Sequence, residues 1–173
     1  MTVSGGVHPD VAEARRLIRS LGSELSAAVP ESGNAEYAAF VSRVGRRSVR
    51  FRASKLTPAK VGAFVATWRR ADDGSTEPFA SEGGADLLVI TVREEPHFGL
   101  FAFPRAALIR HGIVSVDGRG GKRGFRVYPP WSETGNRQAQ RTQEWQCHYF
   151  LGLDDGNRVD MRRAQLLLKD LQN

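Results

Sequence analysis

The stretch ADLLVITVREEPHFGLFAFP, residues 85–104, carries the strongest signal for the fold. Asp86 to Val92 forms a nearly continuous apolar run, which is typical of a central strand covered on both faces. Gly99 to Phe103 predicts a second strand, and Glu95-Pro96-His97 predicts the turn between them. A short helix follows, opened by Pro104 and closed by Gly112. The stretch therefore predicts the centre of a β-sheet followed by a helix.

Further elements are predicted on both sides of this centre. In RSVRFRAS, residues 47–54, alternation places Val49 and Phe51 on the buried face and Arg50 and Arg52 on the other. The remaining predicted elements are strands at 37–43, 113–116 and 125–128, with a hairpin turn near Gly45, and helices at 9–28, from Thr57-Pro58 through Trp68, at 136–150 and at 159–171.

These elements predict one mixed α/β or α+β domain over residues 1–173, with a mixed β-sheet flanked by helices. An N-terminal helix at about 9–28 and a C-terminal helix at about 159–171 enclose a core at about 35–151. The chain has 173 residues, 40% of them hydrophobic, and one cysteine. It shows no signal peptide and no run of 18 apolar residues, so we expect a cytoplasmic protein that does not enter a membrane.

Charge is unevenly distributed along the chain, and the net charge is +6. Between Arg43 and Arg70 there are nine basic residues and no acidic one, whereas Ala71 to Glu95 holds seven acidic residues and one basic. A basic run of that length predicts a face that binds an anionic partner, although such runs are also found on ordinary solvated surfaces.

Catalytic motifs are not found. The four histidines show no zinc-binding spacing, and the sequence contains no GxSxG, Walker or GxGxxG motif. Cys147 and His148 are neighbours on a predicted helix, so their side chains diverge and cannot act as a nucleophile and its base. Asp86 could bind a metal ion, but Glu94 lies about 25 Å away along an extended strand. No cofactor is expected, and Mg²⁺ only if Asp86 pairs with a distant carboxylate such as Glu36.

Anion binding is the better-supported chemistry. The segment GGKRGFRVYPPW, residues 120–131, combines basic and aromatic side chains with glycines that let backbone N–H groups approach a phosphate. Basic side chains next to aromatic ones are typical of proteins that bind single-stranded nucleic acid. The candidate phosphate ligands are Arg50, Arg52, Lys55, Lys60, Lys122, Arg123 and Arg126. Tyr128 and Trp131 are the candidate stacking residues, and Gln143 and Gln146 are candidates for polar contacts.

Four segments also resemble a known family. KLTPAKVGAFVATWRR, GLFAFP, GKRGFRVYPPW and TQEWQCHYF, which lie between Arg52 and Phe150, are similar to signature segments of the MepB-like proteins. The resemblance implies a restriction-endonuclease-like fold, that of the PD-(D/E)XK nucleases. It also implies that the catalytic acids are eroded and that nucleic-acid binding remains. Asp86 could fill the first acidic position, but Leu100 to Arg105 offers no acid-x-Lys.

The leading hypothesis is a non-catalytic protein that binds RNA or single-stranded DNA in preference to duplex. One alternative is a divergent metal-dependent nuclease that uses Asp86. Another is an interaction module whose basic face docks an acidic protein partner.

Overall fold

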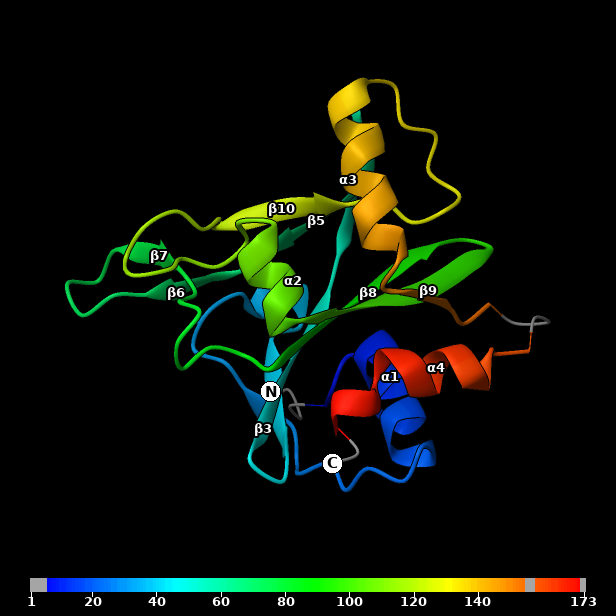
Figure 1. The fold of residues 1–173 in the computed structure, drawn as a ribbon, viewed down its shortest axis with the longest axis horizontal. Coiled ribbons are helices and arrows are strands. Elements are labelled where there is room, and N and C mark those ends of the chain that lie inside the picture. The colour runs from blue at the N-terminus through cyan, green and yellow to red at the C-terminus, as the bar shows by residue number, and fades with distance from the viewer. Residues whose placement is uncertain (1–5, 155–157, 172–173) are drawn as a thin grey trace, which may run out of the picture.

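The computed structural model describes residues 6–154 and 158–171 as a mixed α+β domain built on a six-stranded sheet (Figure 1). The strand order is β1-β2-β3-β8-β9-β11. Strands β3 and β8 are parallel, and the other neighbouring pairs are antiparallel. The strands are β1 (Val29–Pro30), β2 (Phe40–Val44), β3 (Arg47–Ala53), β8 (Leu87–Glu94), β9 (His97–Pro104) and β11 (Phe150–Gly152).

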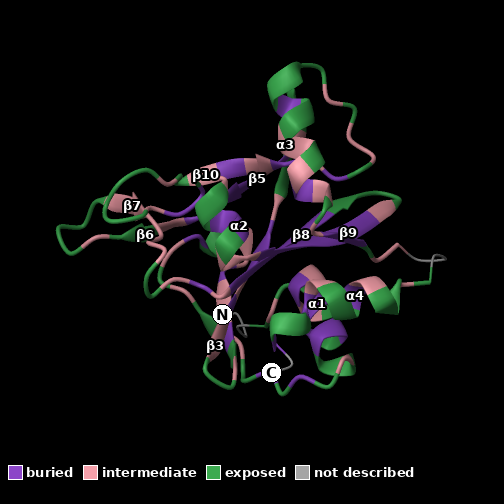
Figure 2. Cartoon of the chain, in the orientation of Figure 1, coloured by how far each residue is buried: buried purple, intermediate pink, exposed green. Residues whose placement is uncertain are grey.

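The two strands predicted at the centre are confirmed as β8 and β9. They pair along their whole length, from Leu87 opposite Pro104 to Glu94 opposite His97. Six consecutive residues of β8 are buried, because both faces of the sheet are covered (Figure 2). Apolar side chains that alternate along β8 therefore enter two separate cores.

Helices cover one face of the sheet. Helix α1 (Pro9–Ser20) and helix α4 (Met161–Leu167) lie side by side there and contribute Val11, Ile18 and Ala164 to the first core (Figure 1). Short 3-10 helices follow Asn34 (η1, Ala35–Tyr37) and close the described chain (η2, Lys169–Leu171).

A second layer covers the opposite face. It contains a three-stranded sheet in the order β10-β5-β4, together with α2 (Arg105–Arg110) and α3 (Arg137–Cys147). Its strands are β4 (Lys55–Thr57), β5 (Lys60–Ala66) and β10 (Gly124–Val127), and a two-stranded ribbon of β6 (Trp68–Arg70) and β7 (Thr76–Pro78) extends from it.

The helix predicted from Thr57-Pro58 is wrong, because this segment forms the β4–β5 hairpin. Thr57 pairs with Lys60, so Pro58 and Ala59 make the turn. The apolar residues fit a helical stripe by spacing, but Gly62 adopts a φ of 82°, which an interior helical residue cannot take. In the strand, Ala63 and Val65 face the core and Val61 is 47% exposed.

Other boundaries also differ from the predictions. The first helix ends at Ser20 and not at Ala28, since Gly22 takes a φ of 93°. Residues 113–116 make only isolated bridges and no strand. The predicted helix at 136–150 ends at Cys147, and Phe150 begins β11, where it pairs with Phe101.

Candidate nucleic-acid interface

A hollow of about 350 Å³ opens between β10 and α3. We call it the β10–α3 pocket. It brings together four residues singled out from the sequence and two that were not. The six are Lys122, Arg126, Tyr128 and Gln146, with His111 and Trp145.

Two glutamines of α3 hold this pocket in shape. The Gln146 side chain is fully buried; its Nε2 donates to the Arg126 carbonyl at 2.8 Å, and its Oε1 accepts from the Tyr128 N–H at 2.7 Å. The Gln143 Nε2 donates to the carbonyls of Pro129 and Ser132, both at 2.9 Å. Both side-chain amides were predicted to make polar contacts with nucleic acid. In the structure, both form hydrogen bonds with the protein's own backbone.

An aromatic pair forms one wall of the pocket. The His111 and Trp145 rings stack with centroids 3.8 Å apart and planes 4° apart, and Trp145 packs in turn against Phe103 of the core. Burial, with a smaller contribution from Arg110, lowers the pKa of His111, which favours a neutral ring at pH 7. Sequence analysis missed both rings, because residues 34 positions apart meet only once α2 and α3 are placed.

Arg126 lies across the outer face of the three-stranded sheet. Its Nη2 donates to the Thr57 hydroxyl at 2.6 Å, and its Nη1 donates to the Val61 carbonyl at 3.3 Å. The register places Arg126 opposite Phe64, and Phe64 opposite Lys55, so these three residues share one face. The Lys55 ammonium lies 5.0 Å from the Tyr37 ring centroid and 3.9 Å from Glu36.

A second, more open hollow of about 740 Å³ lies beside the β4–β5 hairpin and includes Lys60 and Trp131. The Trp131 indole is held in place: its Nε1 donates to Glu94 at 3.1 Å, and its ring stacks on His97 with centroids 4.9 Å apart. One face of this predicted stacking residue is therefore already covered. Lys60 sits on a strand and not, as predicted, at the N-terminus of a helix.

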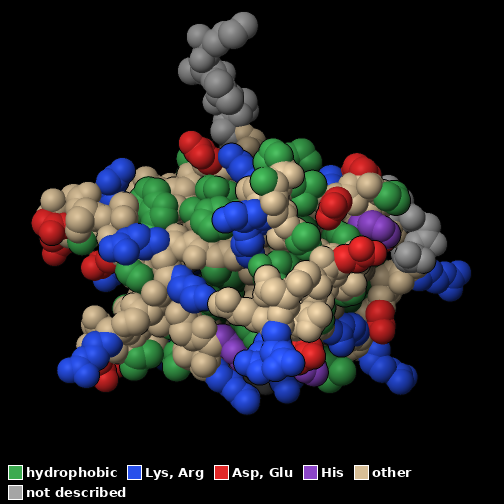
Figure 3. Space-filling view, turned by 90° about the horizontal axis from the view of Figure 1, so that it is seen from above, with side chains coloured by type: hydrophobic (Ala, Val, Ile, Leu, Met, Phe, Trp, Pro, Cys, Tyr) green, Lys and Arg blue, Asp and Glu red, His purple; other side chains and the backbone are tan. Residues whose placement is uncertain are grey.

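Lys122 and Arg123 are both exposed, but they differ in the hydrogen bonds that their side chains make. The Arg123 Nε donates to the Thr76 carbonyl at 3.0 Å and lies toward the β6–β7 ribbon. Within residues 6–154 and 158–171, the Lys122 ammonium has no hydrogen-bond or ion-pair partner. Figure 3, seen from the side of α3 and β10, shows basic side chains spread over this face among polar and apolar ones.

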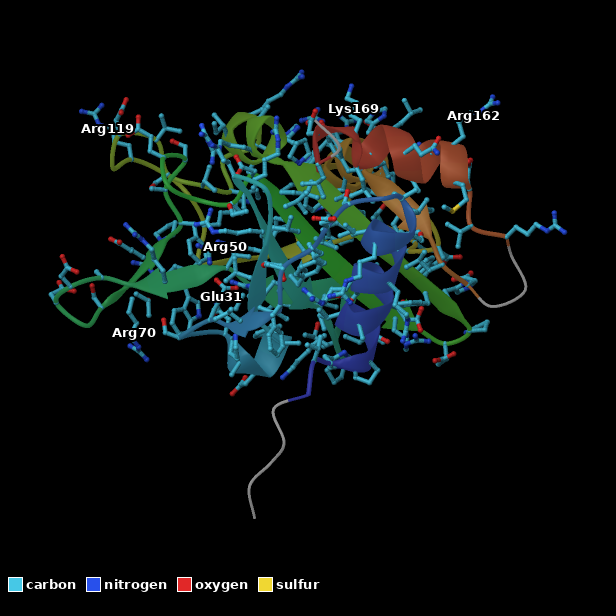
Figure 4. All side chains as sticks on the ribbon, turned by 90° about the horizontal axis from the view of Figure 1, so that it is seen from below. Glu31, Arg50, Arg70, Arg119, Arg162 and Lys169 are labelled. Atoms are coloured by element: carbon cyan, nitrogen blue, oxygen red, sulfur yellow. The ribbon has the colours of Figure 1, made fainter. Side chains whose placement is uncertain are left out.

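Arg50 and Arg52 do not join this surface. Both guanidinium groups pair with the Glu31 carboxylate, and Figure 4 shows the Glu31 and Arg50 side chains close together. The Arg50 guanidinium also lies 4.2 Å from the centroid of the Phe79 ring. Arg52 is completely buried, whereas alternation predicted an accessible face. The second layer covers that face of β3, and the Arg52 Nε donates to the carbonyl of Ala66 in β5 at 3.0 Å.

Asp86, the candidate catalytic acid, lies just before β8 and connects β3 to α2. Its Oδ2 accepts from the Ser48 N–H at 2.8 Å, and its Oδ1 lies 3.0 Å from the Arg105 Nη2. Glu36, its suggested partner, is 82% exposed. Over the described ranges, no group of three or more His, Cys, Asp or Glu side chains is arranged to hold a metal ion.

The MepB-like family model matches residues 31–152. The chain belongs to the MepB-like family. The solved structure "Crystal Structure of MepB" aligns with a TM-score of 0.73 at 34% identity, over 86% of this chain and 98% of that one. A bacterial homing endonuclease, I-Ssp6803I, aligns with a TM-score of 0.44 at 15% identity, over 79% of this chain and 84% of that one. A search of curated proteins finds no match.

Family membership confirms the resemblance drawn from the four sequence segments, and the MepB structure confirms the predicted mixed sheet flanked by helices. None of the helices in the described ranges is long and apolar enough to cross a membrane.

Proposed function

We propose that this MepB-like protein binds single-stranded nucleic acid, RNA or DNA, in the cytoplasm and does not cleave it. The observation that carries the proposal is the β10–α3 pocket, which is lined both by Lys122, whose ammonium has no partner among the described residues, and by the stacked His111 and Trp145 rings. Cations that pair with phosphates next to rings that stack on bases are the two components of single-strand recognition.

The charge of the neighbouring hairpin supports the same proposal. Lys60 lies on β5, which neighbours β10, and Lys55 lies on β4, the next strand outward, so the cations extend from the pocket along the outer layer. A strand of several nucleotides would follow this line, with phosphates at Lys60, Lys122 and Arg126. Arg50 and Arg52 are not part of the proposed path, because both guanidinium groups are paired with Glu31 inside the fold.

Single strands are favoured over duplex because the aromatic rings lie in hollows. Tyr128 lines the β10–α3 pocket and Trp131 lines the hollow at the hairpin. A base can reach either ring only after leaving a helical stack, which costs a few kcal/mol in a duplex.

The test is a fluorescence-anisotropy titration of labelled single-stranded RNA, at several salt concentrations, with and without Mg²⁺. The proposal expects binding whose log affinity falls with log salt by about 0.7 per phosphate contact. The double variant Lys60→Glu/Lys122→Glu should bind weakly and show a reduced salt slope. The matched control Arg162→Glu/Lys169→Glu, with the same charge change on the α4 side, should retain more of the affinity (Figure 4).

Three results would overturn the proposal. Equal losses in both double variants would mean that net charge, and not this surface, attracts the strand. A signal that decays only with Mg²⁺ would mean cleavage, and Asp86→Asn would then test the divergent-nuclease alternative. Binding to an acidic protein, with none to oligonucleotides near physiological salt, would favour the interaction-module alternative.

A further inference from the structure

Strand β10 lies at the edge of its sheet, and half of its backbone groups point away from β5. The Thr67 N–H donates to the Arg123 carbonyl at 2.9 Å, so the backbone groups of Arg123 point toward β5. In an antiparallel pair, the backbone groups of every second residue point to the same side. Phe125 and Val127 therefore bond to β5, while Gly124, Arg126 and Tyr128 direct their N–H and C=O groups outward.

Gln146 uses only part of this outward edge. Its amide pairs with the Arg126 carbonyl and the Tyr128 N–H, in the manner of a neighbouring strand. In the part of the chain that the structure describes, the Gly124 carbonyl and the Arg126 N–H have no protein partner. An acceptor and, two residues later, a donor are thus left side by side.

These two groups face the β10–α3 pocket. Gly124 and Arg126 both line it, and the stacked His111 and Trp145 rings form another of its walls. A volume of about 350 Å³ is in the range of small-ligand sites. Lys122 lines the same pocket with an exposed side chain, so a phosphate attached to an occupant could pair with it.

We propose that the β10–α3 pocket holds one unpaired nucleobase, which the Gly124 carbonyl and the Arg126 N–H read along its Watson–Crick edge. Each of the four bases carries a donor next to an acceptor on that edge, which single-strand binders commonly read. The inference rests on the proposed function and deepens it. In a duplex this edge is already occupied by the complementary base, so the pocket itself selects single strands.

A peptide strand is the other occupant that an open edge can accept. Here Gln146 occupies the next two positions along β10, so an added strand could not continue past Arg126. The adjacent Gly124 carbonyl and Arg126 N–H match the donor and acceptor of a heterocycle edge, whereas a strand would also need the positions that Gln146 already fills.

The first test compares a single-stranded oligonucleotide with the same backbone made entirely of abasic residues. We expect the abasic strand to bind about 5- to 150-fold more weakly, since stacking of a base contributes about 1–3 kcal/mol. Thr142→Trp, which fills the pocket from α3, should remove this difference. Gln140→Trp, on an exposed position of the same helix that does not line the pocket, should retain it.

The second test removes the donor directly. Arg126→Pro deletes an N–H that makes no ladder bond, a change that edge strands tolerate, and Arg126→Ala controls for the lost side chain. The proline variant should bind the intact oligonucleotide more weakly than the alanine variant, and the abasic strand equally. Equal binding of the intact and abasic strands by the unmodified protein would overturn the base pocket while leaving phosphate-driven binding in place.

A third measurement decides the matter if strands do not bind at all, or if the proline variant does not fold. In amide NMR spectra of the unmodified protein, at least one of the four ribonucleoside monophosphates should move the Arg126 amide proton downfield, whereas ribose 5-phosphate should not. If all four leave this proton unmoved, the base pocket is wrong. If a mononucleotide moves it and oligonucleotides still fail to bind, the pocket stands and the strand-binding proposal falls.

Discussion

Two basic regions of this molecule look alike in sequence and behave differently in the fold. The Glu31–Arg50–Arg52 cluster lies between the central sheet and the second layer, where two guanidinium groups share one carboxylate. Around the β10–α3 pocket, by contrast, Lys122 is exposed and unpaired within the described chain. Basic residues that look alike in sequence therefore differ in whether the fold pairs their cations with a carboxylate or leaves them exposed.

The largest expected effect is a loss of stability when the Glu31–Arg50–Arg52 cluster is disrupted. Glu31→Gln leaves Arg52 buried without a compensating charge, which should cost about 3–5 kcal/mol in the free energy of unfolding. Urea denaturation measures this loss. Glu13→Gln, which removes the carboxylate of an exposed pair with Arg16, should change stability by less than about 1 kcal/mol. A small effect at Glu31 would mean that the buried cluster is less coupled than its geometry indicates.

A second variant tests how the pocket is built. Gln146→Ala leaves the Arg126 carbonyl and the Tyr128 N–H without their partner and should cost about 1–3 kcal/mol. Gln140→Ala, exposed on the same helix, is the control and should be nearly neutral. Thermal unfolding of the two variants measures the difference. If Gln146→Ala matched its control, the amide would not be what joins α3 to β10.

A third variant tests whether Lys122, unlike the buried Arg52, contributes to binding and not to stability. Lys122→Gln should leave the free energy of unfolding within about 0.5 kcal/mol of the original, since the ammonium has no protein partner in the described chain. It should nevertheless lower the salt slope of RNA binding by about 0.7, if it contacts one phosphate. Combined denaturation and anisotropy data separate the two quantities. A clear loss of stability with an unchanged salt slope would mean that Lys122, like Arg52, stabilises the fold and does not contact phosphate.

The smallest effect concerns pH. Because burial lowers the folded-state pKa of His111 below that of the unfolded chain, the folded state takes up this proton less readily. The resulting stability is fully present above the unfolded pKa of about 6.5 and is lost as the pH falls through the folded pKa. Thermal stability should therefore decline from pH 7 toward pH 5, and the decline should be smaller in His111→Gln. An identical pH profile for the variant would contradict this.

The central strands could be predicted because their signal is local. Apolar runs separated by a turn specify β8 and β9 without any knowledge of their neighbours. The burial of Arg52 could not be predicted in this way. It depends on a second layer that includes β5, and the helical spacing of Val61, Phe64 and Val65 concealed that strand.

The candidate site was predictable only in part, for a similar reason. Lys122, Arg126 and Tyr128 share one segment, so their grouping was visible in the sequence. Spacing along the chain does not encode the contacts between α2, α3 and β10. These contacts create the His111–Trp145 stack and the hydrogen bond from Gln146 to the β10 backbone. Local patterns located the cations, and tertiary packing determined which of them remain available.

The most direct test of the central claim is amide NMR mapping of the ¹⁵N-labelled protein titrated with a single-stranded RNA oligonucleotide. We predict shifts concentrated in residues 55–62, 122–128 and 137–145, with little change in α1, α4 or the strand that carries Arg50 and Arg52. Shifts confined to α1 and α4, or no shifts at low salt, would contradict this prediction.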